Sequence, residues 1–195
     1  MTKSKNIFQN AILFFIEKGK HPTLGKVKLA KLLFFADMLS FKSFRKTITG
    51  EGYIKLPLGP VPENFDQTLL TMQLNKLINK PTNEFYTNYV SANLELFTKQ
   101  QKEILNLVLT MFKTHYTRDV VDISHKLLPW DTIELYEPIS FELIGLSNVE
   151  AMQLKIKAKE LTTTDIIMNS PDLIASFKKG RDDVRRNRVK EHKWV

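Results

Sequence analysis

The chain has no cysteine among its 195 residues. It can therefore form no disulfide, no zinc–thiolate site and no thiol nucleophile, which excludes disulfide-stapled scaffolds, thiolate metal sites and cysteine enzymes. The absence fits a reducing cytoplasm, where we expect the protein to reside.

Long hydrophobic runs are also missing. The longest apolar patch near the N-terminus covers residues 11–16, whereas a membrane-spanning helix needs about 20 residues. No small-residue cleavage site follows this patch, and the chain contains no internal repeat or low-complexity run. We expect a soluble protein that is not exported and has no membrane partner.

Apolar residues are nevertheless frequent enough to build a core. Hydrophobic residues make up 43% of the chain and aromatic residues 10%, which suits one domain of ordinary size with an extension. The predicted fold class is mainly α: a compact helical domain with a small β-hairpin, followed by a C-terminal helical extension. Apolar periodicity and capping signals predict helices over residues 6–18, 63–79, 98–115 and 117–126.

Positive charge is concentrated at the C-terminus. Residues 176–195 contain eight lysines and arginines against three acidic residues, a net charge of +5, so +3 of the total of +8 remains for residues 1–175. We predict a compact domain over residues 1–145 and a basic helical extension over residues 146–195.

The most informative stretch, residues 28–62, begins with another predicted helix. One face of this helix is apolar and is interrupted by a single carboxylate, Asp37, while Lys28 and Lys31 fall beside it. The apolar positions, three or four residues apart, are Val27, Ala30, Leu33, Phe34, Met38 and Phe41.

Glycines and prolines follow this helix. Gly50 and Gly52 lie between two short strand-like runs, and glycine readily adopts the positive φ of a tight hairpin. We therefore predict a two-stranded ribbon over residues 47–56, packed on the preceding helix. The three prolines of residues 57–62 each fix φ and remove a backbone donor, which predicts a stiff, exposed ledge leading into the next helix.

Three ordered segments of this stretch resemble the signature of the Panacea domain, the SocA-like antitoxin family. They are Lys31–Asp37 (KLLFFAD), Thr49–Tyr53 (TGEGY) and Gly59–Pro62 (GPVP). The resemblance continues to Ser124–His125 and Pro129–Trp130, and so covers about residues 5–140. Leu58 departs from the pattern, because family members usually place an aromatic residue there. If that position contacts a partner, the partner of this chain differs there; if it belongs to the core, leucine is a tolerable replacement.

The resemblance implies an antitoxin of a type II toxin–antitoxin system, encoded beside its toxin, that silences the toxin by binding it. Toxins paired with this domain include translation inhibitors and alarmone synthetase-like enzymes, so the family does not identify the partner. It implies no catalysis, no cofactor and no metal, and it leaves a homo-oligomer open. The residues expected to bind the toxin are Lys28, Lys31, Phe35, Asp37, Glu51, Tyr53, Gly59, Pro60, Pro62 and Trp130.

These residues also have structural interpretations. Lysines beside an apolar stripe usually form only the solvated face of a helix. Asp37, at the edge of the stripe, would then accept a hydrogen bond from a backbone donor of the hairpin, because a buried carboxylate needs partners. Trp130 follows a proline and is more often a core residue than an anchor of an interface.

The sequence contains only weak catalytic and metal-binding patterns. Two histidines and two aspartates fall within residues 115–125, but no ordered three-ligand motif appears, so we interpret them as helix surface residues. Ser124 and His125 are adjacent and point about 100° apart on a helix, which excludes a nucleophile–base pair. We expect His125 to pack near Trp130.

Two other functions stay open. The basic C-terminal tail suits a nucleic-acid-binding regulator of its own operon, because lysines and arginines neutralise phosphates without special geometry. No helix-turn-helix signature supports it, however. A hydrolase or metal-dependent phosphotransferase would use Asp37, Asp119 and His125, and has the least support.

Overall fold

The structure is a computed structural model that describes residues 3–19, 24–79, 86, 89–148 and 150. The chain divides into two units, Met1–Asn148 and Val149–Val195, and all the described residues but one belong to the first. The extension predicted over residues 146–195 lies almost entirely outside the described residues, so its boundary and its helices stay predictions.

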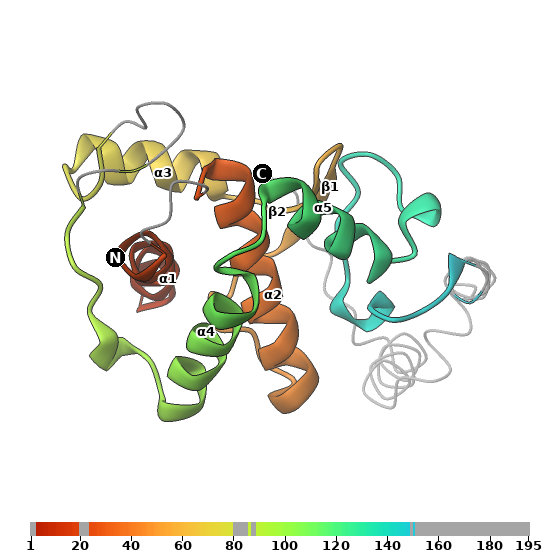
Figure 1. The fold of residues 1–195 in the computed structure, drawn as a ribbon, viewed down its shortest axis with the longest axis horizontal. Coiled ribbons are helices and arrows are strands. Elements are labelled where there is room, and N and C mark those ends of the chain that lie inside the picture. The colour runs from red at the N-terminus through yellow and green to blue at the C-terminus, as the bar shows by residue number, and fades with distance from the viewer. Residues whose placement is uncertain (1–2, 20–23, 80–85, 87–88, 149, 151–195) are drawn as a thin grey trace, which may run out of the picture. The chain divides into compact units, whose positions relative to one another are not determined.

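The first unit is mainly α-helical with one small hairpin, as the sequence predicts (Figure 1). The helices are α1 (Lys3–Lys18), α2 (Lys26–Phe44), α3 (Phe65–Leu74), α4 (Lys99–Phe112) and α5 (Thr117–Lys126), and the strands are β1 (Tyr53–Leu56) and β2 (Gly59–Pro62). The described residues also form three short 3₁₀ helices, η1 (Leu94–Leu96), η2 (Trp130–Thr132) and η3 (Phe141–Leu143). No helix in the described part of the chain is both long enough and apolar enough to cross a membrane.

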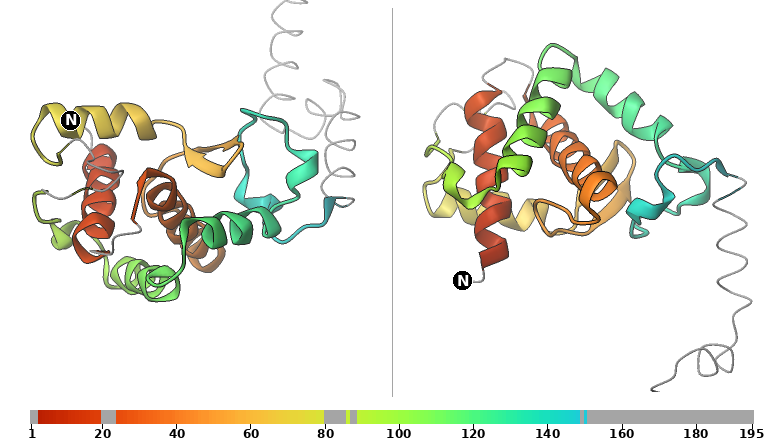
Figure 2. Two further views of the ribbon diagram at one scale, coloured as in Figure 1. Left: turned by 45° about the horizontal axis from the view of Figure 1, so that its top comes forward. Right: turned by 90° about the horizontal axis from the view of Figure 1, so that it is seen from below.

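Helix α2 is the central element of this unit. It packs against α1, α4, α5 and β2, which surround it in all three views (Figures 1 and 2). Every residue from Lys28 to Met38 is buried, including Lys28 at 2% exposure and Lys31 at 0%. The interpretation of these two lysines as a solvated face is therefore wrong, because neighbouring elements cover the helix on all sides.

Aromatic rings join α2 to its neighbours. Phe35 stacks on Phe112 of α4 with ring centroids 4.4 Å apart, and Phe34 meets Tyr53 of β1 edge to face at 5.4 Å. Such pairs stabilise a core by about 0.5–1.5 kcal/mol beyond the burial of their area. The ring contacts thus fix the position of the ribbon relative to α2 and α4.

The ribbon lies further along the chain than predicted. Strand β1 pairs antiparallel with β2, so that Tyr53 lies opposite Pro62 and Lys55 opposite Pro60. Of the ribbon predicted over residues 47–56, the second strand is therefore confirmed as β1. The segment predicted as the first strand, residues 47–49, forms no strand.

Prolines are tolerated in β2 because of the pattern of the ladder. The N–H of Lys55 donates to the Glu137 carbonyl oxygen, 3.0 Å away and on the edge of β1 that faces away from β2. The pair Lys55–Pro60 is therefore a non-hydrogen-bonded pair of the ladder, where the missing N–H of Pro60 costs no bond.

The ends of the helices agree in part with those predicted from the sequence. The predicted capping box of Thr98 and Gln101 opens α4, which ends at Phe112, three residues earlier than expected. Helix α5 ends at Lys126 as expected, but the sequence predicts Thr117 as its N-cap, and in the structure the N-cap is Tyr116, whose N–H lies 3.2 Å from the Asp119 carboxylate. Helix α3 is shorter than the predicted range 63–79 at both ends.

Candidate functional site

The family-like segments meet where β2 crosses α2. The ammonium group of Lys31 donates to the carbonyl oxygen of Pro60, 2.7 Å away, in a buried hydrogen bond. Gly59 has a φ of +101°, and a Cβ there would lie 2.5 Å from Lys31 Cε and 2.8 Å from Ser124 Oγ. Only glycine fits this conformation and this close approach. The contact brings α2, β2 and α5 together at one point.

Lys31 has no acidic partner in the described part of the chain. Each ion pair found there joins other residues. Burial lowers the pKa of Lys31 to about 7, because taking an ammonium group out of water disfavours its charged form. A buried cation without a carboxylate is unusual, since buried charges are normally paired.

Lys28 ties α2 to the junction between α4 and α5. Its ammonium group donates to the carbonyl oxygen of His115, just beyond the end of α4, where a cation also meets the negative end of the helix dipole. Burial lowers the pKa of Lys28, and the nearby carboxylate of Asp119 partly opposes this shift.

Asp37 collects the donors of the segment that follows α2. Its carboxylate accepts from the N–H of Ile48 at 2.6 Å and of Thr49 at 2.9 Å, from the Thr49 hydroxyl, and from the Tyr53 hydroxyl at 2.8 Å. Burial raises the pKa of Asp37 to about 6, against the opposing effect of these bonds. The expected bond to a backbone donor is confirmed, and it explains why Ile48 and Thr49 form no strand: their N–H groups bond to Asp37.

Most of the residues expected at the toxin-binding surface are buried. Glu51 and Trp130 are half-buried, and the exposed part of residues 57–62 is the turn, Pro57 and Leu58. The prediction of an exposed ledge is wrong for residues 59–62, where Val61 is half-buried and the others are buried, because β2 packs against both α2 and α5. The buried residues are Lys28, Lys31, Phe35, Asp37, Tyr53, Gly59, Pro60 and Pro62.

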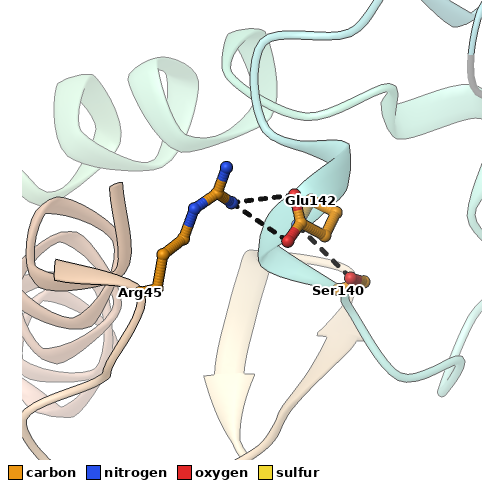
Figure 3. A network of polar contacts seen from close by, with 3 residues as sticks. All are labelled: Arg45, Ser140 and Glu142. Carbon is orange, nitrogen blue, oxygen red and sulfur yellow. Dashed lines mark hydrogen bonds and ion pairs between the residues drawn. The ribbon is translucent and has the colours of Figure 1, made fainter. Parts of the chain in front are cut away.

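Glu51 borders an open hollow of about 560 Å³ between the end of α2 and η3. The amide of Asn64 donates to its carboxylate at 2.9 Å. Arg45 and Ser140 also line the hollow: Arg45 Nη1 donates to both carboxylate oxygens of Glu142, at 3.0 and 3.1 Å, and Ser140 Oγ accepts the N–H of Glu142 (Figure 3). Arg45 and Glu142 are largely exposed, so this ion pair contributes little to stability.

Trp130 lies between two basic side chains. His125 stacks on its ring with centroids 4.0 Å apart, as expected, and the Lys55 ammonium lies 4.5 Å from the ring centroid. Lys55 also donates to the carbonyl oxygens of Trp130 and Ile133, both at 2.7 Å. Burial lowers the pKa of His125, and the charges of Lys31 and Lys55 lower it further. No cluster of metal-ligating side chains occurs among the described residues.

A groove of about 350 Å³ lies between α2, the turn of the ribbon and the start of α3; we call it the tip groove. Leu58, on its wall, is 55% exposed, so this position is not a core position. The departure of Leu58 from the family pattern was the only sequence signal for this groove. Its lining residues are Lys26, Val27, Ala30, Lys31, Leu56, Pro57, Leu58, Val61, Phe65 and Asp66.

The family comparison covers most, though not all, of the residues that form these contacts. The model of the SocA-like antitoxin, Panacea domain, matches residues 29–131, which run from α2 to η2. No curated protein and no solved structure matches the chain. The matched segment includes the bond from Lys31 to Pro60, the donors gathered by Asp37, and Trp130. The chain therefore belongs to the SocA-like, Panacea-domain family of antitoxins.

Proposed function

We propose that this protein neutralises a cognate toxin by binding it directly, as the antitoxin of a type II toxin–antitoxin system. The observation that carries the proposal is the family match over residues 29–131. The toxin is encoded next to this gene, and both proteins act in the cytoplasm.

The buried residues of the family signature support the proposal because they hold the ribbon in a fixed position. Lys31 and Asp37, both on α2, form hydrogen bonds with residues 11 to 29 positions further along the chain. These buried bonds and the ring contacts hold the ribbon in one position before any partner arrives. A preorganised surface loses little conformational entropy on binding, which favours affinity.

Neutralisation in this proposal is stoichiometric, with the toxin covered by the antitoxin and no reaction catalysed. The Ser124 hydroxyl supports this, because it donates to the Val121 carbonyl oxygen at 2.7 Å and so does not donate to His125. The ring of His125 is stacked on Trp130. Neither side chain is placed as part of a nucleophile–base pair.

A second activity, binding of operator DNA, is favoured by one observation. Residues 176–195 carry a net charge of +5, which suits contacts to phosphates. This activity would add autoregulation to neutralisation and would not replace it.

Expression of the neighbouring reading frame tests the proposal. Each adjacent frame is expressed alone from an inducible promoter, and growth is measured with and without this gene on a second plasmid. The matched control is the same gene with a stop codon after residue 30, which keeps the transcript but removes the protein. We expect one neighbour to arrest growth alone and the intact gene alone to restore it. Failure of the intact gene to restore growth would contradict the proposal.

A further inference from the structure

The tip groove combines an apolar wall with two lysines and one aspartate, which are Lys26, Lys31 and Asp66. Resting on the proposed function, we propose that it receives an apolar side chain of the toxin that is flanked by an acidic residue. The groove would then be the anchor point of the complex, and Leu58 the residue that adapts it to this toxin.

The wall of the groove calls for an apolar occupant. Val27 and Ala30 on α2, Leu56 and Val61 on the ribbon, and Phe65 on α3 present hydrocarbon to the cavity. A volume of about 350 Å³ is at the small end of ligand pockets and suits one or two side chains. Buried apolar anchors of this kind dominate the affinity of protein interfaces.

The charges around the groove call for an acidic neighbour. Lys26 and Asp66 form an ion pair with each other at 2.7 Å, which balances their charges. Lys31 lines the same groove and has no carboxylate partner among the described residues. The pKa of Lys31 is about 7, so a carboxylate placed in the groove would favour the charged form of Lys31 and would be attracted to it.

Net charge also distinguishes the possible occupants of the tip groove. The chain's own residues 176–195 carry +5, and a second copy of the chain carries +8, so both have the same sign as Lys31. Nucleic acid carries the opposite charge, but a phosphate backbone has no apolar group that would fill the groove. An acidic segment of a partner protein satisfies both requirements.

Leu58 links the groove to this chain's particular partner. It stands at the turn of the ribbon, half exposed, and forms one wall of the groove. Substituting it changes the shape of the groove without removing a contact of the core. Specificity for one toxin among several is expected to depend on such a position.

Calorimetric titration with the purified toxin from the neighbouring frame tests the proposal. Leu58→Asp should weaken binding at least about thirtyfold, the usual effect of removing an interface anchor. Val27→Phe fills the groove and should weaken binding at least about tenfold. The matched control is Leu107→Asp on α4, at a leucine 50% exposed against 55% for Leu58 and not part of the groove, which should change the affinity less than about twofold.

Asp66→Asn tests the charge of the occupant. It removes the one acidic side chain of the groove at an exposed position and should strengthen binding about threefold or more, because the toxin's carboxylate is no longer repelled. Thermal melts show that each variant folds.

Three results would overturn the inference, and they can be told apart. Wild-type affinity in both Leu58→Asp and Val27→Phe would place the anchor elsewhere while leaving the proposed function intact. Weaker binding by Asp66→Asn would show that the occupant is not acidic. Absence of any complex with the wild-type protein would overturn this inference and the proposed function together.

Discussion

Lys31 and Pro60 are 29 residues apart in the sequence and are joined by a buried hydrogen bond of 2.7 Å between a side-chain ammonium and a backbone carbonyl. The bond ties the central helix α2 to the strand β2 and positions the turn between the two strands. The residues of the family signature thus form contacts inside the protein, and the tip groove is the exposed surface beside them.

Asp37→Ala should lower the free energy of unfolding by about 3 kcal/mol or more. The substitution leaves two backbone N–H groups and the hydroxyls of Thr49 and Tyr53 without their acceptor, and each unsatisfied buried group costs about 1–3 kcal/mol. Urea unfolding followed by circular dichroism measures the loss. Glu103→Ala, at an exposed position of α4, serves as the control and should stay within about 0.5 kcal/mol of wild type. An equally small effect at Asp37 would show that these bonds do not hold the segment.

Gly59→Ala should destabilise the protein more than Gly145→Ala. Both glycines have positive φ, at +101° and +86°, so both variants carry backbone strain of about 1–2 kcal/mol. Only at Gly59 does a Cβ also meet Lys31 and Ser124, whereas at Gly145 the nearest atom is 3.6 Å away. The difference between the two unfolding free energies therefore measures the close approach of β2 to α2. We expect it to exceed about 1 kcal/mol, and equal losses would refute the close approach.

The stability of the protein should rise with pH above 7, and Lys31 should be responsible for much of the rise. The pKa of Lys31 is about 7 in the folded protein and 10.5 ordinarily, so the unfolded chain retains a proton that the folded protein releases. Stability then increases by about 2 kcal/mol from pH 7 to pH 9.

Lys31→Met isolates that contribution, because it removes the titrating group and keeps a stem of similar length. Urea unfolding of both proteins at pH 7 and pH 9 gives the two slopes. The variant should lose most of the rise, while the bond lost to Pro60 costs about 1–3 kcal/mol at both pH values. The same rise in both proteins would show that Lys31 keeps its ordinary pKa.

Deletion of residues 168–195 should leave cooperative unfolding nearly intact. The sequence of this segment offers only a sparse apolar stripe, at Leu173, Phe177, Val184 and Val189, so it would contribute little to a core. Differential scanning calorimetry should show a midpoint within about 4 °C of wild type, equivalent to less than about 1 kcal/mol. Loss of the thermal transition would show that the segment is structural.

The same deletion tests DNA binding. If the tail contacts operator DNA, the full-length protein should shift it in a gel at low salt, the affinity should fall steeply as salt rises, and the truncated protein should not bind. No shift by the full-length protein at low salt would count against the regulator function.

The helices were predictable from the sequence because their signals are local. The capping box of Thr98 and Gln101 and the apolar periodicity on either side of it depend on residues within one or two turns. The acceptor role of Asp37 was also predictable, since a carboxylate on an apolar face needs donors nearby in the chain.

The burial of the lysines was not predictable from local pattern. Lys31 bonds to a carbonyl oxygen 29 residues away and Lys28 to one 87 residues away, and neither partner is marked by a residue type, because every residue has a carbonyl oxygen. The predicted position of the ribbon was wrong for a related reason. Gly50 marks a bend correctly, with a φ of 75°, but Asp37 captures the donors that a strand there would need.

Sedimentation of the purified protein mixed with the purified toxin, both treated with nuclease, tests direct neutralisation most directly. We expect a stable complex of defined stoichiometry at low micromolar concentration, formed without nucleic acid, with the same toxin whose growth arrest this gene relieves. Relief of growth arrest in cells, together with two separately sedimenting species at tens of micromolar, would contradict it.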